Sequence, residues 1–211
     1  PSAFAGNISL IDLQALNETY GLQYRFPNIR ESSTAQHGHR QKISNTLINL
    51  AFEEFCRNNR YGHIKKAFSR YCESNAIWLD DYALFLLLKK KNKNLAWNRW
   101  PVELKERDAK VLMKVQQENN RALERIKFAQ FVFHEQFLSL RQYANHSGVK
   151  IIGDIPIYIN YDSADVWSHP ELFRLDVKGN MITVAGVPPD YFSKTGQRWN
   201  MPVYDWKRMK Q

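Results

Sequence analysis

The hydrophobic positions of this chain change their spacing from one stretch to the next. Between residues 41 and 147 they recur every three or four positions, which is the period of a helix with one buried face. A stripe of this kind holds Ile43, Leu47, Leu50, Ala51 and Phe55. The spacing therefore predicts helices almost throughout residues 41–147.

A long helix from about Ala122 to Asn145 ends this stretch. Its apolar stripe is wide, so we expect it to be covered on more than one side. The stripe holds Ile126, Phe128, Ala129, Phe131, Phe133, Phe137, Leu140 and Ala144. Gly148 follows as a natural left-handed cap, and Pro101 suits the first position of an earlier helix.

An apolar run follows Gly148. It begins at Val149 and continues to Ile159, which predicts a buried strand. Helix, short glycine turn and apolar strand is the order typical of an α/β unit. A carboxylate inside such a strand, here Asp154, must be paired or hydrogen-bonded.

Residues 160–206 carry few helix or strand signals but many aromatic and acidic side chains. Long loops inside compact domains are functional or disordered, and disordered segments are poor in aromatics. We therefore expect an ordered binding surface. Within it we expect Asp162 and Asp165 to cap turns and Trp167 to lie in the core.

The first 40 residues predict short, irregular structure. Leu10–Leu13 could form a strand or the entry to a helix, and residues 25–39 are polar and typical of a loop. At 211 residues with 44% hydrophobic content, the chain can bury a sizeable core in one large or two small domains. No apolar run approaches the ~20 residues that a membrane span needs.

The two cysteines, Cys56 and Cys72, are too few for a disulfide framework. With no visible signal peptide, they predict reduced thiols and a cytoplasmic protein. The net charge of +9 raises the alternative of a nucleic-acid-binding protein. However, the excess lies wholly within residues 41–150, and no reading motif accompanies it. We interpret Lys89–Lys91 as a solvated helix end that complements the helix dipole, with a phosphate-binding patch as the alternative.

Several long motifs resemble the 4-α-glucanotransferase (amylomaltase) family. They are Ser2–Asn7, Trp78–Phe85, Trp97, Trp100-Pro101, Gly153–Tyr158, Asp162–Trp167, Pro170–Phe173, Ala185–Ser193, Thr195–Gln197 and Trp199. Motifs of this length are specific, and they span nearly the whole chain.

The resemblance implies an α/β fold, a partial (β/α)8 (TIM) barrel of the α-amylase-like type with a largely helical insertion subdomain. Residues 1–40 would form a barrel-associated loop and short elements, and residues 41–120 the helical insertion. Residues 121–211 would supply a barrel helix, the third strand and the substrate-binding loop. Barrel active sites lie at the carboxyl ends of the strands, so that loop would border the site.

The activity implied is transfer of α-1,4-glucan segments between maltooligosaccharides by double displacement, with no metal or organic cofactor. Retaining enzymes of this kind use two carboxylates ~5 Å apart. The resemblance places the nucleophile and the acid/base after Gln211, and the first barrel strands before Pro1. We therefore expect a fragment that is inactive alone and that self-associates or pairs with the rest of the enzyme.

The substrate-binding residues implied by the resemblance lie in the third strand and the loop after it. Aromatic planes suit the C–H faces of sugars and polar groups suit their hydroxyls; the set is Asp154, Asp190, Tyr191, Phe192, Gly196, Gln197 and Trp199. Asp154 would orient active-site groups, with a purely structural carboxylate as the alternative. For the loop aromatics the alternative is simple space filling.

The sequence departs from the family pattern at Asn200-Met201-Pro202, where Gly-Asn-Pro is common. Asparagine tolerates a left-handed conformation better than most residues, so we expect the turn to survive. The competing functional class is a non-catalytic glucan-binding or regulatory fragment, and a basic nucleic-acid-binding helical protein is a third.

Overall fold

The computed structural model describes residues 2–26 and 35–209, and the side chains from residue 40 onward in the second range. The chain divides into two compact units, each assembled from separate stretches of sequence. The helical unit comprises residues 6–76 and 124–152, and the hairpin unit comprises residues 1–5, 77–123 and 153–211. The units are therefore interleaved in sequence, whereas the sequence analysis divided the chain into three consecutive stretches.

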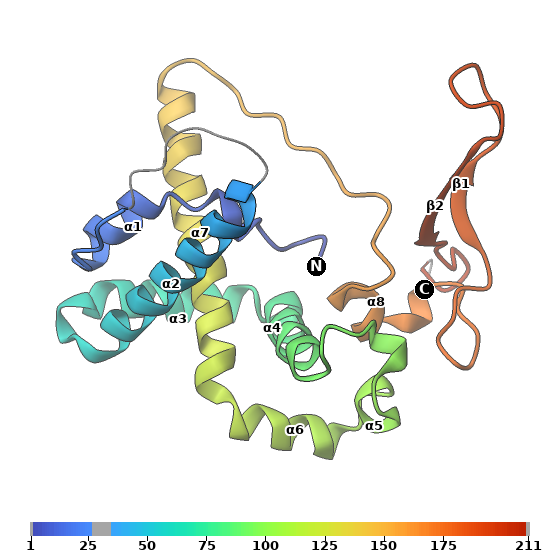
Figure 1. Cartoon of the computed structure of the whole chain (residues 1–211), viewed down its shortest axis with the longest axis horizontal. Coiled ribbons are helices and arrows are strands. Elements are labelled where there is room, and N and C mark those ends of the chain that lie inside the picture. Colours follow the sequence, from blue (N-terminus) through green and yellow to red (C-terminus); the bar gives the residue numbers. More distant parts are fainter. Residues whose placement is uncertain (1, 27–34, 210–211) are drawn as a thin grey trace. The chain divides into compact units, whose positions relative to one another are not determined.

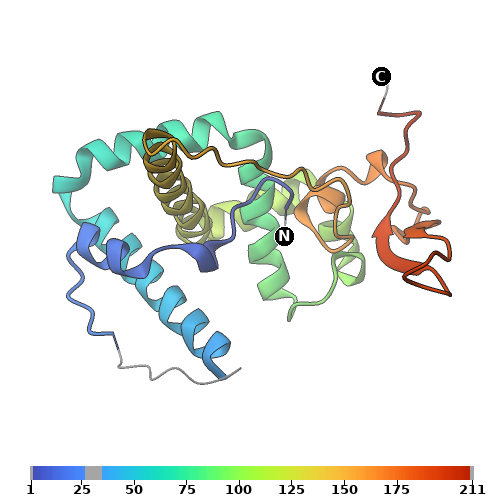
Figure 2. The ribbon, with the colours of Figure 1, turned by 90° about the horizontal axis from the view of Figure 1, so that it is seen from above.

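The helical unit gathers its helices around one long helix. The elements are η1 (Ile8–Leu10), α1 (Leu13–Tyr20), α2 (Ala35–Arg57), η2 (Asn59–Tyr61), α3 (Gly62–Ser74) and α7 (Asn120–His146). Figures 1 and 2 show α1, α2 and α3 around α7. Asp12 caps α1 by accepting hydrogen bonds from two backbone N–H groups. Of the two alternatives for Leu10–Leu13, the helix entry is thus confirmed.

Aromatic side chains form the centre of the helical unit. Phe128 of α7 is fully buried, and its ring lies 4.9 Å from that of Phe55 and 5.5 Å from that of Phe52, both on α2. The Tyr20 ring of α1 lies 5.6 Å from Phe128, and the Phe68 ring of α3 lies 6.2 Å from it. One residue of α7 therefore contacts three other helices, as its wide apolar stripe predicts.

Two glutamines of α7 hold the segment that precedes α1. The Gln130 amide accepts from Gly6 N at 2.9 Å and donates to Gly6 O at 3.1 Å. Gln136 makes the same pair of bonds with Asp12 N and O, at 2.7 and 3.1 Å. A Cβ atom added at Gly6 would lie 2.0 Å from the Phe133 ring, so the close approach requires glycine.

The hairpin unit packs short helices around three tryptophans. Its elements are α4 (Ala76–Lys91), η3 (Trp97–Arg99), α5 (Val102–Lys105), α6 (Ala109–Glu118), α8 (Ala164–Ser168), η4 (Pro170–Leu172), β1 (Val184–Val187) and β2 (Gln197–Pro202). Trp97, Trp100 and Trp167 are all buried, and the Trp100 and Trp167 rings contact Phe85. Trp167 therefore lies in the core, as predicted.

The predicted strand at Val149–Ile159 is wrong. These residues have no regular secondary structure in Figure 1, and most of their side chains are exposed, Ile152 by 94%. A strand is held by hydrogen bonds to neighbouring strands, and among the described residues no strand pairs with this run. The apolar run therefore remains an irregular segment here.

A two-stranded sheet lies where the sequence analysis expected a loop. Strands β1 and β2 are antiparallel, with Val184 opposite Pro202 and Val187 opposite Gln197. Figure 1 shows them side by side, joined by the turn at one end. The sequence analysis missed this hairpin because its strands are short and contain glycine and proline, which strand patterns lack.

The helical predictions for residues 41–147 are confirmed in outline, including Gly148 with a φ of 76° after α7. Three stripe residues are exposed rather than buried: Leu50, Phe137 and Leu140. Pro101 precedes α5 instead of being its first residue. The loop predicted over residues 25–39 is wrong from Ala35 onward, where α2 begins, and residues 27–34 lie outside the described residues. Among the described helices none is long and apolar enough to span a membrane.

Candidate substrate-binding hairpin

The base of the β1–β2 hairpin is tied to the tryptophan core by the segment that starts at Tyr161. Trp97 donates its indole N–H to Tyr161 O at 2.8 Å, and Lys89 forms an ion pair with Asp162. The Tyr161 hydroxyl donates to Gly179 O, and burial raises the pKa of Tyr161 to about 12. Asp162 thus pairs with a lysine of α4 instead of only capping a turn, and Lys89 is not merely solvated.

The neck of the hairpin has glycine on both sides. Gly196 has a φ of 70°, and a Cβ atom there would lie 2.5 Å from Val187 O. A Cβ atom on Gly186 would lie 2.4 Å from Gln197 O. The close approach that Gly196 allows is therefore to the opposite strand of its own hairpin.

Asp190 shapes the turn that joins the strands. Its Oδ1 accepts from Phe192 N at 2.9 Å and from Ser193 N at 2.7 Å, while its own N–H donates to Ser193 O at 2.9 Å. Ser193 Oγ donates to Gly196 O at 2.7 Å and closes the turn. One carboxylate oxygen of Asp190 therefore organises the backbone, while the residue remains exposed.

Tyr191 and Phe192 project from this turn. Tyr191 is 96% exposed and Phe192 is 89% exposed, and their rings meet edge to face at 5.5 Å. Side chains this exposed do not fill space beneath a loop, so the space-filling alternative does not describe these two residues. The two rings lie at right angles to each other, and both are open to solvent.

Trp199 is held in place by two neighbours. Its Nε1 donates to Gln197 Oε1 at 3.0 Å, and its ring packs edge to face against Tyr158 at 4.9 Å. Gln197 therefore orients the indole, in addition to the expected role of its amide with sugar hydroxyls. Tyr158 was not among the predicted site residues; its place in a predicted strand gave no indication that it would meet Trp199.

A bulge in β2 follows Trp199. The register shifts between Val184 and Gly186 of β1, opposite the part of β2 that contains Asn200. Asn200 has a φ of 58°, so the left-handed turn expected at this departure from the family pattern is confirmed. A bulge redirects the side chains next to it, which here include that of Trp199.

Asp154 is not gathered with the other predicted site residues. It is exposed, and its Oδ1 accepts a hydrogen bond from the next residue, Ile155 N, at 2.8 Å. The expectation of a buried carboxylate in a strand is therefore wrong for this structure. Asp154 is exposed because the strand predicted at residues 149–159 does not form, and an irregular exposed segment does not bury its side chains.

Comparison with known proteins places the chain in a family. The family model described as 4-alpha-glucanotransferase matches residues 1–211. The 4-alpha-glucanotransferase of Thermus thermophilus is 40% identical over 205 residues, which are 97% of this chain and 41% of that protein. The Clostridium butyricum enzyme of the same name is 39% identical, over 97% of this chain and 42% of that protein.

Among solved structures, the amylomaltase from Streptococcus agalactiae in complex with acarbose is similar to this chain. The TM-score is 0.88 at 30% identity, and the match covers 99% of this chain and 42% of that one. The chain thus spans about two-fifths of the length of these relatives. A match over the whole chain, together with a fold of the same kind, shows that the chain belongs to the 4-alpha-glucanotransferase family.

Proposed function

We propose that this chain provides the substrate-binding hairpin of a 4-alpha-glucanotransferase. The full-length protein would transfer α-1,4-glucan segments between maltooligosaccharides by retaining double displacement. The observation that carries the proposal is the family match over residues 1–211, which includes the exposed aromatic hairpin tip. The S. agalactiae relative was solved with acarbose bound, which supports a saccharide ligand.

The proposed site residues divide by chemistry. Tyr191, Phe192 and Trp199 offer ring faces on which the apolar faces of glucosyl units pack. The carboxylate of Asp190 and the amide of Gln197 accept or donate hydrogen bonds to hydroxyls, beyond the structural bonds that they make. Gly196 allows the hairpin neck to close and so sets the direction of the tip.

The proposed fold places residues 149–159 in a partial (β/α)8 barrel. In the full-length protein, neighbouring strands would supply the hydrogen bonds that this run lacks. The Asp154 side chain would then be buried at the carboxyl-terminal end of the barrel strands, where it would orient active-site groups. The nucleophile and the acid/base, two carboxylates ~5 Å apart in retaining enzymes, would come from outside these 211 residues.

Double displacement explains why transfer needs no cofactor. One carboxylate attacks the anomeric carbon while the other protonates the leaving oxygen, and then deprotonates the hydroxyl of the incoming glucan. The hairpin's part is to bind the chain near the bond that breaks. We also propose a cytoplasmic location, because two cysteines in 211 residues are too few for the disulfide framework that is typical of secreted proteins.

The test is incubation of the full-length protein with maltotriose. We expect glucose together with maltooligosaccharides longer than maltotriose, and proton NMR should show that the newly formed bonds keep the α configuration. Products no longer than the starting sugar would indicate hydrolysis, and that outcome, like the absence of any product, would contradict the proposal.

A further inference from the structure

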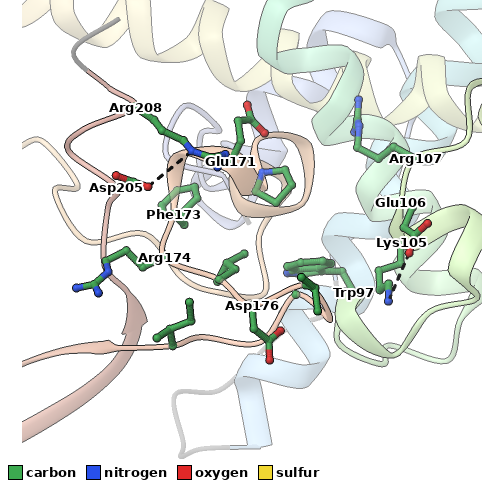
Figure 3. Close-up of a pocket in the computed structure, with 15 residues that line it drawn as sticks. Trp97, Lys105, Glu106, Arg107, Glu171, Phe173, Arg174, Asp176, Asp205 and Arg208 are labelled. Atoms are coloured by element: carbon green, nitrogen blue, oxygen red, sulfur yellow. Dashed lines mark ion pairs between the residues drawn. The ribbon is translucent and has the colours of Figure 1, made fainter.

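A pocket of about 420 Å³ lies in the hairpin unit, away from the aromatic tip (Figure 3). Its size falls within the ~300–1,000 Å³ of small-molecule sites. No residue between 184 and 202 lines it, so it is separate from the proposed substrate-binding surface. It is lined by Trp97, residues 105–107, Pro170, Glu171, residues 173–177, Gly179, Ile182, Asp205 and Arg208.

The pocket lies at the base of the hairpin. Ile182 precedes β1 and Asp205 follows β2, and both line the pocket. Backbone bonds fix this base: Asp205 N donates to Leu172 O at 2.8 Å, and Ile182 N donates to Arg174 O at 3.0 Å. The pocket and the aromatic tip therefore lie toward opposite ends of one continuous element.

Charged side chains of both signs line the pocket in equal number, four basic and four acidic. Two ion pairs are marked in Figure 3, Lys105 with Glu106 at 4.0 Å and Arg208 with Asp205 at 3.7 Å. A pocket with balanced charge favours neither an anion nor a cation. Its carboxylate and guanidinium groups instead provide acceptors and forked donors for neutral polar groups.

Apolar surface completes the lining. Trp97 and Phe173 contribute aromatic surface, and the exposed side chains of Val177 and Ile182 lie at the pocket. Arg107 also lines the pocket. Its guanidinium is held in place by an ion pair with Asp81 at 2.6 Å and by packing over the Trp167 ring at 4.3 Å. Apolar surface beside paired charges suits a ligand whose faces are C–H groups and whose edges are hydroxyls.

We propose that this pocket is an accessory site for the glucosyl units of an α-1,4-glucan, an inference that rests on the proposed function. Sugar hydroxyls are neutral and need both donors and acceptors, which the ion-paired groups supply. Because the pocket and the tip lie toward opposite ends of the hairpin, only a glucan longer than maltotriose would reach both. The pocket would therefore favour long substrates over short ones.

The kinetic test removes two exposed pocket side chains in the full-length protein, in the double variant Glu171→Ala/Arg208→Ala. We expect KM for amylose to rise about threefold to tenfold, the scale of one or two hydrogen bonds. The kcat for amylose and both constants for maltotriose should be unchanged. The control is Lys178→Ala/Lys207→Ala, which changes two exposed neighbours that do not line the pocket and should alter nothing.

A binding test separates this inference from the proposed function. Sulfur-linked maltotriose resists cleavage and is too short to reach both sites at once, so calorimetric titration should show two sites on the full-length protein. The Glu171→Ala/Arg208→Ala variant should lose one site, while Tyr191→Ala weakens the other. A single site, or an unchanged amylose KM in the double variant, would overturn the accessory site alone. Failure of maltotriose transfer by the wild-type protein would instead contradict the proposed function.

Discussion

The two aromatic side chains at the hairpin tip, Tyr191 and Phe192, have almost no packing to lose. Exposure of 96% and 89% means that truncation removes little buried area, so stability and binding can be separated at these positions. Trp199 differs, because its ring already contacts Tyr158 and its indole N–H is bonded to Gln197. A change at Trp199 would therefore mix local structure with binding.

Tyr191→Ala in the full-length protein should weaken maltooligosaccharide binding without lowering the melting temperature. Stacking of aromatic groups is worth ~0.5–1.5 kcal/mol beyond buried area, which for a sugar face corresponds to a roughly threefold to tenfold rise in Kd. Calorimetric titration and thermal melting measure the two effects. Ile77→Ala removes an equally exposed apolar side chain, at 86%, from another part of the hairpin unit and should change neither quantity. Unchanged affinity in Tyr191→Ala would remove this residue from the site.

Tyr161 links stability to pH. Burial raises its pKa in the folded protein to about 12, whereas the unfolded chain has the ordinary value of ~10. The folded state therefore holds the proton more tightly, so this contribution is complete below pH 10 and is lost as the pH rises through 12. Tyr161→Phe should be less stable at pH 9, where it lacks the bond to Gly179 O, but should lose less stability between pH 9 and 11. Urea unfolding at both pH values measures this, and an equal loss in both proteins would contradict it.

At single positions the sequence predicted what depends on one residue's own chemistry. The left-handed conformation of Asn200 and the cap at Gly148 are of this kind. It did not predict contacts between residues that are distant along the chain, such as Tyr158 with Trp199 or Lys89 with Asp162. Side-chain type sets which contacts are chemically suitable, but the fold decides which of them form.

At the scale of elements, helices were predictable and strands were not. Helix hydrogen bonds join residues four apart, so the sequence between residues 41 and 147 contains the information that its helices need. A strand depends on a partner elsewhere in the chain. The apolar run at residues 149–159 has a strand composition without a partner among the described residues, while β1 and β2 pair despite an unpromising composition.

The two glutamine contacts of α7 allow a comparison between matched sites. Gln130 is 2% exposed, so Gln130→Ala would leave the N–H and C=O of Gly6 unpaired where water has little access. Each such group costs ~1–3 kcal/mol, and we expect a loss of about 2 kcal/mol or more by urea unfolding. Gln136→Ala removes an equivalent pair of bonds from Asp12 at a more exposed site, where water replaces them, and should cost less than ~1 kcal/mol. Equal losses would show that burial does not control this contact.

At the scale of the whole molecule, the chain exposes many large apolar side chains in a short stretch of sequence. They are Phe137, Leu140, Tyr143, Val149, Ile151, Ile152, Ile155, Ile157 and Tyr158. Large apolar side chains that are left in water favour association. In relatives more than twice as long as this chain, such a stretch has further polypeptide available to cover it.

A polypeptide of residues 1–211 alone should therefore self-associate. We expect a mass above that of a monomer in light scattering at micromolar concentration, and binding of a dye that reports exposed apolar surface. The triple variant Phe137→Ser/Leu140→Ser/Ile152→Ser should shift the protein toward monomer while its helical circular dichroism is retained. A monomeric wild-type polypeptide that binds no dye would show that this stretch is covered in solution.

The hydrogen bonds that shape the hairpin tip join Asp190, Phe192, Ser193 and Gly196, all within seven positions of one another. The tip is therefore organised before any ligand arrives. Ordering a flexible loop on binding costs conformational entropy, and a preorganised loop avoids much of that cost. A glucan reaching this turn would meet two aromatic faces already set at right angles. The free energy of its contacts would therefore contribute to affinity without being offset by the cost of ordering the turn.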